Sequence, residues 1–150
     1  MIKTLINLVL LVLGPSSVFA DIVTKCDSPH GYSYFVAGSF VPKKEAGWVE
    51  DGISKGSYLV TRDADGKYDI IFSDAINRTI SSREDGGEVV VISKSDNRLV
   101  LVVAYPEMNV ETWYFRIDLS GTGELTVSQA RYGEASFINK HSLMKAACSK

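Results

Sequence analysis

Short runs of β-branched and aromatic residues, separated by even shorter turn-forming connections, constrain this fold more than any other feature of the sequence. These runs are bounded by Gly, Asp, Asn, Ser and Pro, which is typical of β-strands. A parallel pair of strands needs a crossover of a dozen residues or more, and the connections are too short for that. The sequence therefore predicts an all-β, single-domain antiparallel meander of about 7–9 strands. The runs lie at 57–62, 67–73, 77–82, 88–93, 98–105, 110–118 and 124–131.

The first two runs predict the clearest hairpin. They flank the sequence DADG, in which Gly66 can adopt the positive φ that closes a tight turn. The runs VVVI (89–92) and LVLVVA (99–104) are apolar on both faces, so we expect both faces to be covered.

Apolar and polar residues alternate more regularly in the run at 110–118 than in these two runs. Trp113, Phe115 and Ile117 are expected on one face of that strand. For the last stretch, 136–147, we favour a closing strand over a short helix. Strands in this number fit a barrel-like sheet, with a two-sheet β-sandwich as the alternative.

The N-terminus has the pattern of a secretory signal peptide. Lys3 precedes the apolar run Leu5–Leu13, and small residues stand before Asp21. The sequence predicts cleavage after Ala20, which would leave a single β domain at 21–150 with no transmembrane segment. The expected location is periplasmic or secreted.

Both cysteines, Cys26 and Cys148, lie near the ends of this predicted domain. In an oxidising compartment two cysteines form one disulfide most simply. We therefore predict that this bond ties the N-terminal segment to the C-terminal segment, as closure of a barrel requires.

Charge and motifs exclude several functions. The 16 basic residues are scattered and are outnumbered by 18 acidic ones, which makes nucleic acid an unlikely partner. The sequence contains no HExxH, P-loop or GxGxxG motif, so it does not identify a reaction, and no cofactor is expected.

The tract at 38–56 is the least regular in the predicted domain, and irregular tracts carry function more often than hairpin turns do. Phe40, Trp48, Glu50 and Asp51 are therefore the candidate binding residues. The alternative for Trp48 is that it plugs an open end of the barrel.

Metal binding has only weak candidates. Asp63, Asp65 and Asp69 form part of a calcium-loop pattern, but Phe72 stands where a bidentate Glu is needed. His30 and His141 would be brought to one end of the domain by the disulfide, but no third ligand can be named. No metal site is therefore predicted.

The Gly-rich stretch Ser120–Gly123, in an exported β-meander, is similar to a turn of small periplasmic β-barrel inhibitors of lysozyme. The tyrosine that such inhibitors carry just after this turn is absent, and Leu125 and Thr126 stand in its place. Because the resemblance covers four residues and a fold class, it does not assign the chain to that family.

The sequence thus favours a non-catalytic binding or protein-interaction module of the bacterial cell envelope, with an unknown protein or small ligand as partner. An extracytoplasmic hydrolase or hydrolase inhibitor is the alternative.

Overall fold

The computed structural model describes residues 20–150 except 75, 77, 119 and 134–135. The predicted signal peptide, apart from Ala20, lies outside these residues. The described residues form ten β-strands and one short 3₁₀ helix: β1 (Asp21–Phe35), η1 (Lys43–Glu45), β2 (Gly47–Gly52), β3 (Ser57–Arg62), β4 (Tyr68–Ser73), β5 (Thr79–Ser81), β6 (Glu88–Ser95), β7 (Arg98–Tyr105), β8 (Asn109–Ile117), β9 (Thr122–Arg131) and β10 (Lys140–Ser149). No helix in this part of the chain is long and apolar enough to cross a membrane.

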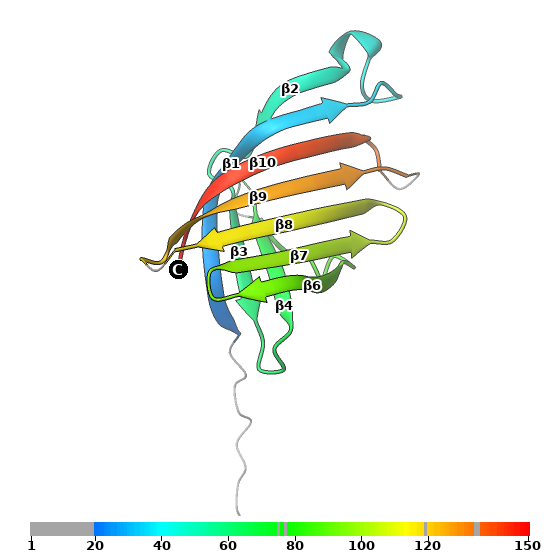
Figure 1. The fold of residues 1–150 in the computed structure, drawn as a ribbon. Helices are drawn as coiled ribbons and strands as arrows, with labels where there is room; N and C mark the ends of the chain where they lie inside the picture. Colours follow the sequence, from blue (N-terminus) through cyan, green and yellow to red (C-terminus); the bar gives the residue numbers. More distant parts are fainter. Residues whose placement is uncertain (1–19, 75, 77, 119, 134–135) are drawn as a thin grey trace, which may run out of the picture.

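The strands form one antiparallel sheet in the order β5-β4-β3-β1-β10-β9-β8-β7-β6, and β2 also pairs with β1. The sheet curls so that β3 and β4 lie behind β6, β7 and β8 (Figure 1). This confirms the predicted all-β, barrel-like fold, as a half-barrel built from a single sheet. The expected β3–β4 hairpin is also present, with Gly66 at φ 80° in its turn.

The first strand, β1, organises the sheet because it changes partner halfway along its length. Residues Asp21–Asp27 pair with β3, whereas His30–Phe35 pair with β2. At the change the register against β10 shifts, and Pro29 lies in the shift. A proline fits there because a β-bulge leaves one residue unpaired and needs no backbone N–H from it. The bend directs the second half of β1, together with β2, into an arm at one end of the half-barrel (Figure 1).

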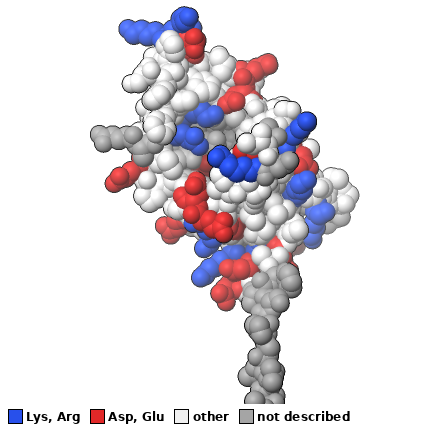
Figure 2. All heavy atoms as spheres, turned by 180° about the vertical axis from the view of Figure 1, so that it is seen from behind, with Lys and Arg blue, Asp and Glu red and all other residues white. Residues whose placement is uncertain are grey.

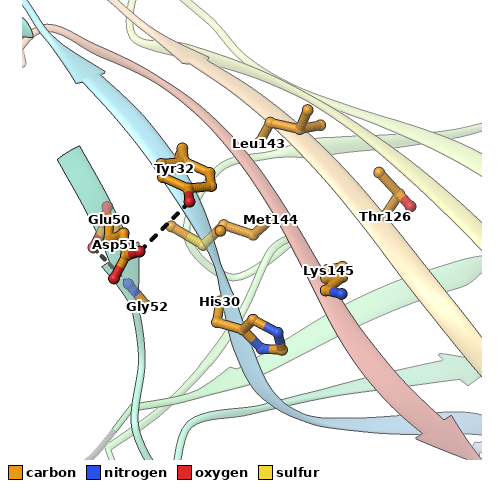
Figure 3. Close-up of a pocket in the computed structure, with 10 residues that line it drawn as sticks. His30, Tyr32, Glu50, Asp51, Gly52, Thr126, Leu143, Met144 and Lys145 are labelled. Carbon is orange, nitrogen blue, oxygen red and sulfur yellow. Dashed lines mark hydrogen bonds between the residues drawn. The ribbon is translucent and has the colours of Figure 1, made fainter. Parts of the chain in front are cut away.

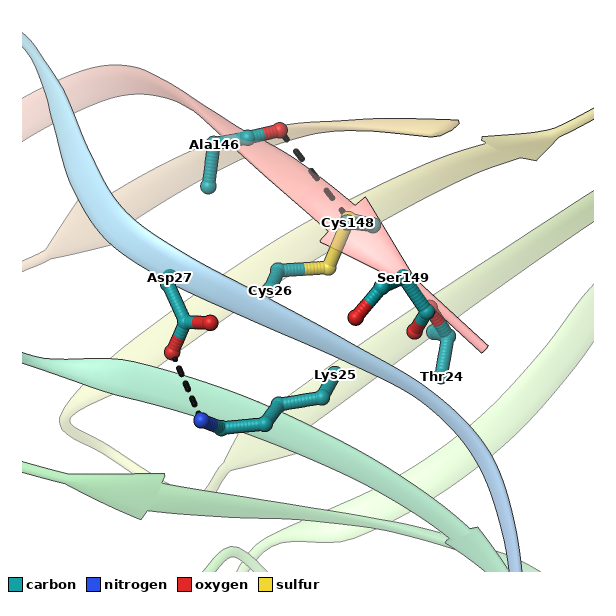
Figure 4. Close-up of a disulfide and its surroundings, with 7 residues drawn as sticks. All are labelled: Thr24, Lys25, Cys26, Asp27, Ala146, Cys148 and Ser149. Carbon is teal, nitrogen blue, oxygen red and sulfur yellow. Dashed lines mark hydrogen bonds and ion pairs between the residues drawn. A yellow bond between two sulfur atoms is a disulfide. The ribbon is translucent and has the colours of Figure 1, made fainter. Parts of the chain in front are cut away.

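The predicted disulfide is present. Cys26 of β1 and Cys148 of β10 are directly opposite each other, with Cα atoms 4.0 Å apart, and both are buried (Figure 4). Next to it, the Thr24 hydroxyl donates a hydrogen bond to the Ser149 carbonyl oxygen at 2.9 Å. The first and last strands are therefore joined as barrel closure requires, but the sheet stays open between β6 and the β4–β5 side.

The core lies on the inner face of the curl. Trp113 and Phe115 of β8 are buried there, as their alternation predicts, and Ile117 is half-buried. The rings of Trp113 and Phe115 stack with centroids 6.2 Å apart. Other large side chains at the centre of this core are Ile70, Leu101, Leu125, Val60, Val103 and Val127.

The prediction that both faces of VVVI and LVLVVA are covered is wrong. In β7, Leu99, Leu101 and Val103 are buried, whereas Val100, Val102 and Ala104 on the other face are half-buried. The run VVVI lies in β6, which is the last strand of the sheet, and Val90, Val91 and Ile92 are 41, 42 and 60% exposed. The physical reason is that, among the residues that the structure describes, β6 is the edge of a single open sheet: no second layer covers its outer face, and no further strand continues the curl over its inner face.

Two segments that the sequence left less certain form strands. The tract at 38–56 is more regular than expected because β2 lies within it and pairs with β1 after the Pro29 bulge. The last stretch forms the expected closing strand, β10, rather than a helix.

Candidate functional site

The four candidate binding residues are in three different places. Trp48 and Glu50 are exposed positions of β2, two residues apart and therefore on one face of that strand. Asp51 lies on the opposite, inner face, where it bonds to Ser33 and Lys140. Phe40 belongs to the loop before η1.

The plug alternative for Trp48 is wrong, because this side chain is 65% exposed. Its indole packs edge-on against the ring of Tyr34, directly opposite on β1, with centroids 5.5 Å apart. Phe40 is 64% exposed and packs in the same way against Phe137, with centroids 5.7 Å apart. Both aromatic residues therefore offer apolar surface to solvent, as a binding role needs.

Neighbouring pairs extend the surface that begins at Trp48 and Tyr34. Tyr32 lies opposite Glu50 on β2 and opposite Leu143 on β10, and both Tyr32 and Leu143 are 54% exposed. The Tyr32 hydroxyl donates a hydrogen bond to Glu50 Oε1 at 3.5 Å (Figure 3). Sequence reasoning left Tyr32 and Leu143 out of the site because only the strand register brings them together.

The same register carries two rows of side chains across the outer side of the sheet, since directly paired residues share a face. One row starts at Trp48 and the other at Glu50, and both run through β1, β10, β9, β8 and β7. We call these twelve residues the outer face: Trp48, Tyr34, His141, Ala130, Val110 and Ala104, and Glu50, Tyr32, Leu143, Ser128, Thr112 and Val102.

The outer face is poor in charge. Among its twelve residues, Glu50 is the one Asp, Glu, Lys or Arg. By contrast, basic and acidic side chains are interspersed on the side of the molecule seen in Figure 2. Surface that combines exposed Tyr and Trp with few charges has the composition of the centre of a protein–protein interface.

A groove of about 800 Å³ adjoins the outer face at the bend of β1. Tyr32, Glu50 and Leu143 belong to both, and His30 and Lys145 add polar groups at the groove (Figure 3). The groove is therefore continuous with the outer face through Tyr32, Glu50 and Leu143.

On the inner side, Asp51 anchors β2 to its neighbours. Its carboxylate accepts hydrogen bonds from Ser33 Oγ at 2.6 Å and Lys140 Nζ at 3.0 Å, and from the Gly52 backbone at 2.8 Å. Although burial opposes ionisation, the bonds from Ser33 and Lys140 and the charge of Lys140 hold the pKa of Asp51 below its usual 3.8. Ser33 is completely buried and also bonds to Ser142 at 2.7 Å, so this cluster positions strands and does not present a nucleophile.

The expectation that His30 and His141 share one end of the domain is wrong. His30 pairs with Lys145 and His141 pairs with Tyr34, so they lie four positions apart along β1. At the usual rise of a strand that is about 13 Å, too far for a shared metal ion. Among the described residues, no group of three or more His, Cys, Asp and Glu side chains could hold a metal.

The three aspartates of the calcium-loop pattern serve the β3–β4 hairpin and its surroundings instead. Asp63 accepts a hydrogen bond from the Lys67 backbone at 2.8 Å within the turn. Asp69 accepts hydrogen bonds from Ser81 Oγ and from the Ile70 backbone. Asp65 is exposed in the turn. The carboxylates of Asp63 and Asp69 thus bind different partners and do not form a common site.

Comparisons with known proteins add no functional assignment. No family model matches the chain, and neither the curated proteins nor the solved structures contain a match. In the structure, Ser120 and Gly121 lie in the turn before β9, and Thr122 and Gly123 begin that strand. Asp118 accepts hydrogen bonds from Ser120 and Thr122. The likeness to lysozyme inhibitors therefore stays confined to this turn and the fold class.

Proposed function

We propose that this protein is a non-catalytic binding module of the bacterial cell envelope that recognises a partner protein through its outer face. The observation that carries the proposal is the pairing of Trp48 with Tyr34 and of Tyr32 with Leu143 on a surface with one formal charge. Aromatic side chains of this kind dominate the binding energy of interfaces.

Two further features support this role. The outer face spans six paired strands, so its aromatic side chains are held in position before any partner binds, which lowers the entropic cost of binding. The predicted signal peptide and the disulfide between Cys26 and Cys148 support a function outside the cytoplasm.

The hydrolase alternative has weaker support. In the described part of the chain, the one hydrogen bond of a histidine side chain joins His30 Nδ1 to the backbone oxygen of Ser28. A nucleophilic hydroxyl needs a base within hydrogen-bond reach. The hydrolase-inhibitor alternative is one form of partner binding, and the same experiment covers it.

The test is capture of envelope proteins by immobilised wild-type protein, Trp48→Ala and Ile76→Ala. Ile76 is 82% exposed on the connection between β4 and β5 and serves as the control. Loss of a buried interface aromatic costs about 2 kcal/mol, so Trp48→Ala should weaken capture about 30-fold. Ile76→Ala should retain it.

Urea denaturation must show that Trp48→Ala is still folded. A partner that binds wild type and Trp48→Ala equally would refute the outer face as the binding site. Sedimentation of the purified protein distinguishes another occupant, because self-association lost in Trp48→Ala would assign this face to a second copy of the chain.

A further inference from the structure

The inner side of the half-barrel contains a cavity of about 560 Å³. This volume is within the range of small-molecule sites. Tyr58, Phe72 and Trp113 contribute to its apolar lining, together with Ile70 and Met144. The Tyr58 ring packs against Trp113 and Phe72, with centroids 4.7 and 5.4 Å apart. The cavity thus offers a rigid aromatic surface to the apolar body of a ligand.

Glu111 of β8 lines the same cavity although it is only 5% exposed. Its Oε1 accepts hydrogen bonds from Asn109 Nδ2 at 2.7 Å and Gln129 Nε2 at 2.8 Å. Its Oε2 accepts one, from Trp113 Nε1 at 3.0 Å. A carboxylate has about two acceptor sites on each oxygen. Oε1 is therefore saturated, and Oε2 keeps one open site.

The charge of Glu111 is not neutralised within the described residues. All three of its donors are neutral, and no Lys or Arg there forms an ion pair with it. Burial raises the pKa of Glu111 despite the three hydrogen bonds and the more distant attraction of Arg131. The carboxylate would therefore gain from a positive group brought into the cavity.

Most of the cations that line the cavity are already paired. Lys140 forms an ion pair with Asp51 at 3.0 Å, and Arg78 forms one with Asp74 at 3.4 Å. Arg131 also lines the cavity but is exposed. An anionic ligand would thus compete with existing carboxylates for Lys140 and Arg78.

The acidic groups of the cavity also affect the pKa of two tyrosines that line it, Tyr58 and Tyr105. Burial, followed by the charges of Glu111 and Asp51, raises the pKa of Tyr58. Burial and the charges of Glu111 and Asp85 also raise the pKa of Tyr105, against a hydrogen bond with Ser82. Tyr58 of β3 and Tyr105 of β7 therefore both lie near enough to Glu111 for its charge to oppose their ionisation.

We propose that this cavity binds a small amphiphilic amine, with its ammonium group on Glu111 Oε2 and its apolar body against Tyr58, Phe72 and Met144. An N–H donor of the ammonium group would fill the open acceptor site of Oε2 with a charge-assisted hydrogen bond, which is about twice as strong as a neutral one. The aromatic rings of the lining add a cation–π attraction. This site is separate from the outer face and does not depend on it.

The test uses three probes of similar size: 2-phenylethylamine, 2-phenylethanol and 3-phenylpropionate. Indole N–H resonances report binding directly, because the chain has two tryptophans and only Trp113 donates to Glu111. The amine should shift the Trp113 resonance and leave that of Trp48 unchanged. Its affinity at neutral pH should exceed those of the alcohol and the acid by about tenfold or more.

Glu111→Gln removes the charge and keeps the shape of the side chain. This variant should lose the tenfold preference for the amine and bind the alcohol as wild type does. Asp85→Asn is the matched control, since Asp85 lines the cavity but is exposed and is not placed on the proposed ammonium. Asp85→Asn should keep the preference.

Three results would overturn the proposal. They are no shift of the Trp113 resonance with millimolar amine, tighter binding of 3-phenylpropionate than of the amine, and an undiminished amine preference in Glu111→Gln. Because the first two are measured on wild-type protein, they remain decisive even where Glu111→Gln does not fold. None of these results bears on capture of a partner by the outer face.

Discussion

Removal of the disulfide should destabilise the protein by acting mainly on the unfolded chain. Cys26 and Cys148 are 122 residues apart in sequence, and the chain-entropy relation gives about 5 kcal/mol for a loop of this size. In the folded state the two residues are already neighbours on the paired strands β1 and β10. Structure remaining in the unfolded chain reduces the gain, so we expect the free energy of unfolding to fall by about 2–5 kcal/mol.

The assay is urea denaturation of three proteins: oxidised wild type, reduced wild type, and the double variant Cys26→Ala/Cys148→Ala. Reduced wild type keeps both buried sulfur atoms, so its difference from the oxidised form measures the cross-link alone. The double variant adds the packing loss of two buried thiols. The urea dependence should also become steeper without the bond, because a chain that is not cross-linked exposes more surface when it unfolds.

Equal midpoints and equal urea dependences of the oxidised and reduced proteins would refute this reasoning. That result would mean that the unfolded chain keeps its two ends together without the bond. Alkylation of native protein in the absence of reductant would contradict the bond itself.

Two further predictions concern the pH dependence of stability and the bend of β1. Because the pKa of Glu111 is raised above 4.5 in the folded state, the folded protein binds this proton more tightly, and the unfolding free energy should fall as pH rises from 4.5 through that pKa. Urea melts at several pH values should show that the unfolding free energy of Glu111→Gln falls less with rising pH than that of wild type. Equal pH dependences of the two proteins would contradict the raised pKa of Glu111. Gly31→Ala should lower the free energy of unfolding by about 1–3 kcal/mol, because the added Cβ would collide with the backbone carbonyl oxygen of Leu143. Gly38→Ala, where nothing lies within 4 Å of the added Cβ, should change the urea midpoint far less, and equal effects of the two substitutions would contradict the steric argument.

The strands were predictable where local sequence decides the structure. Short turns such as the one at Gly66 leave two β runs no arrangement other than an antiparallel hairpin, and alternation places Trp113 and Phe115 on one face. The prediction that VVVI is covered on both faces was wrong because apolar residues on both faces are typical of a central strand, and the sequence does not show where the sheet ends.

The candidate site was only partly predictable, for a different reason. Trp48 and Glu50 were predicted because their tract lacks the regular spacing of strands and turns seen elsewhere in the sequence. Their neighbours in space are set by the pairing of β1 with β2 and β10. The bulge at Pro29 sets which residues of β1 face β2, and a slip of one position would exchange the two faces. Tyr32 could have been suspected from its alternation with Tyr34, whereas Leu143 comes from a strand more than one hundred residues away.

The alternation of β2 explains how one short strand can serve two purposes. Glu50 and Asp51 are adjacent in sequence, but one side chain points to the outer face and the other to the interior. The inner carboxylate is tied to Ser33 of β1 and Lys140 of β10, so β2 is held to both strands at once. Trp48 projects from the strand anchored in this way, and an exposed indole held in place loses less entropy on binding than one on a free loop. The polar contacts of Asp51 are therefore part of what makes the outer face suitable for recognition, although Asp51 itself lies on the other side of the sheet.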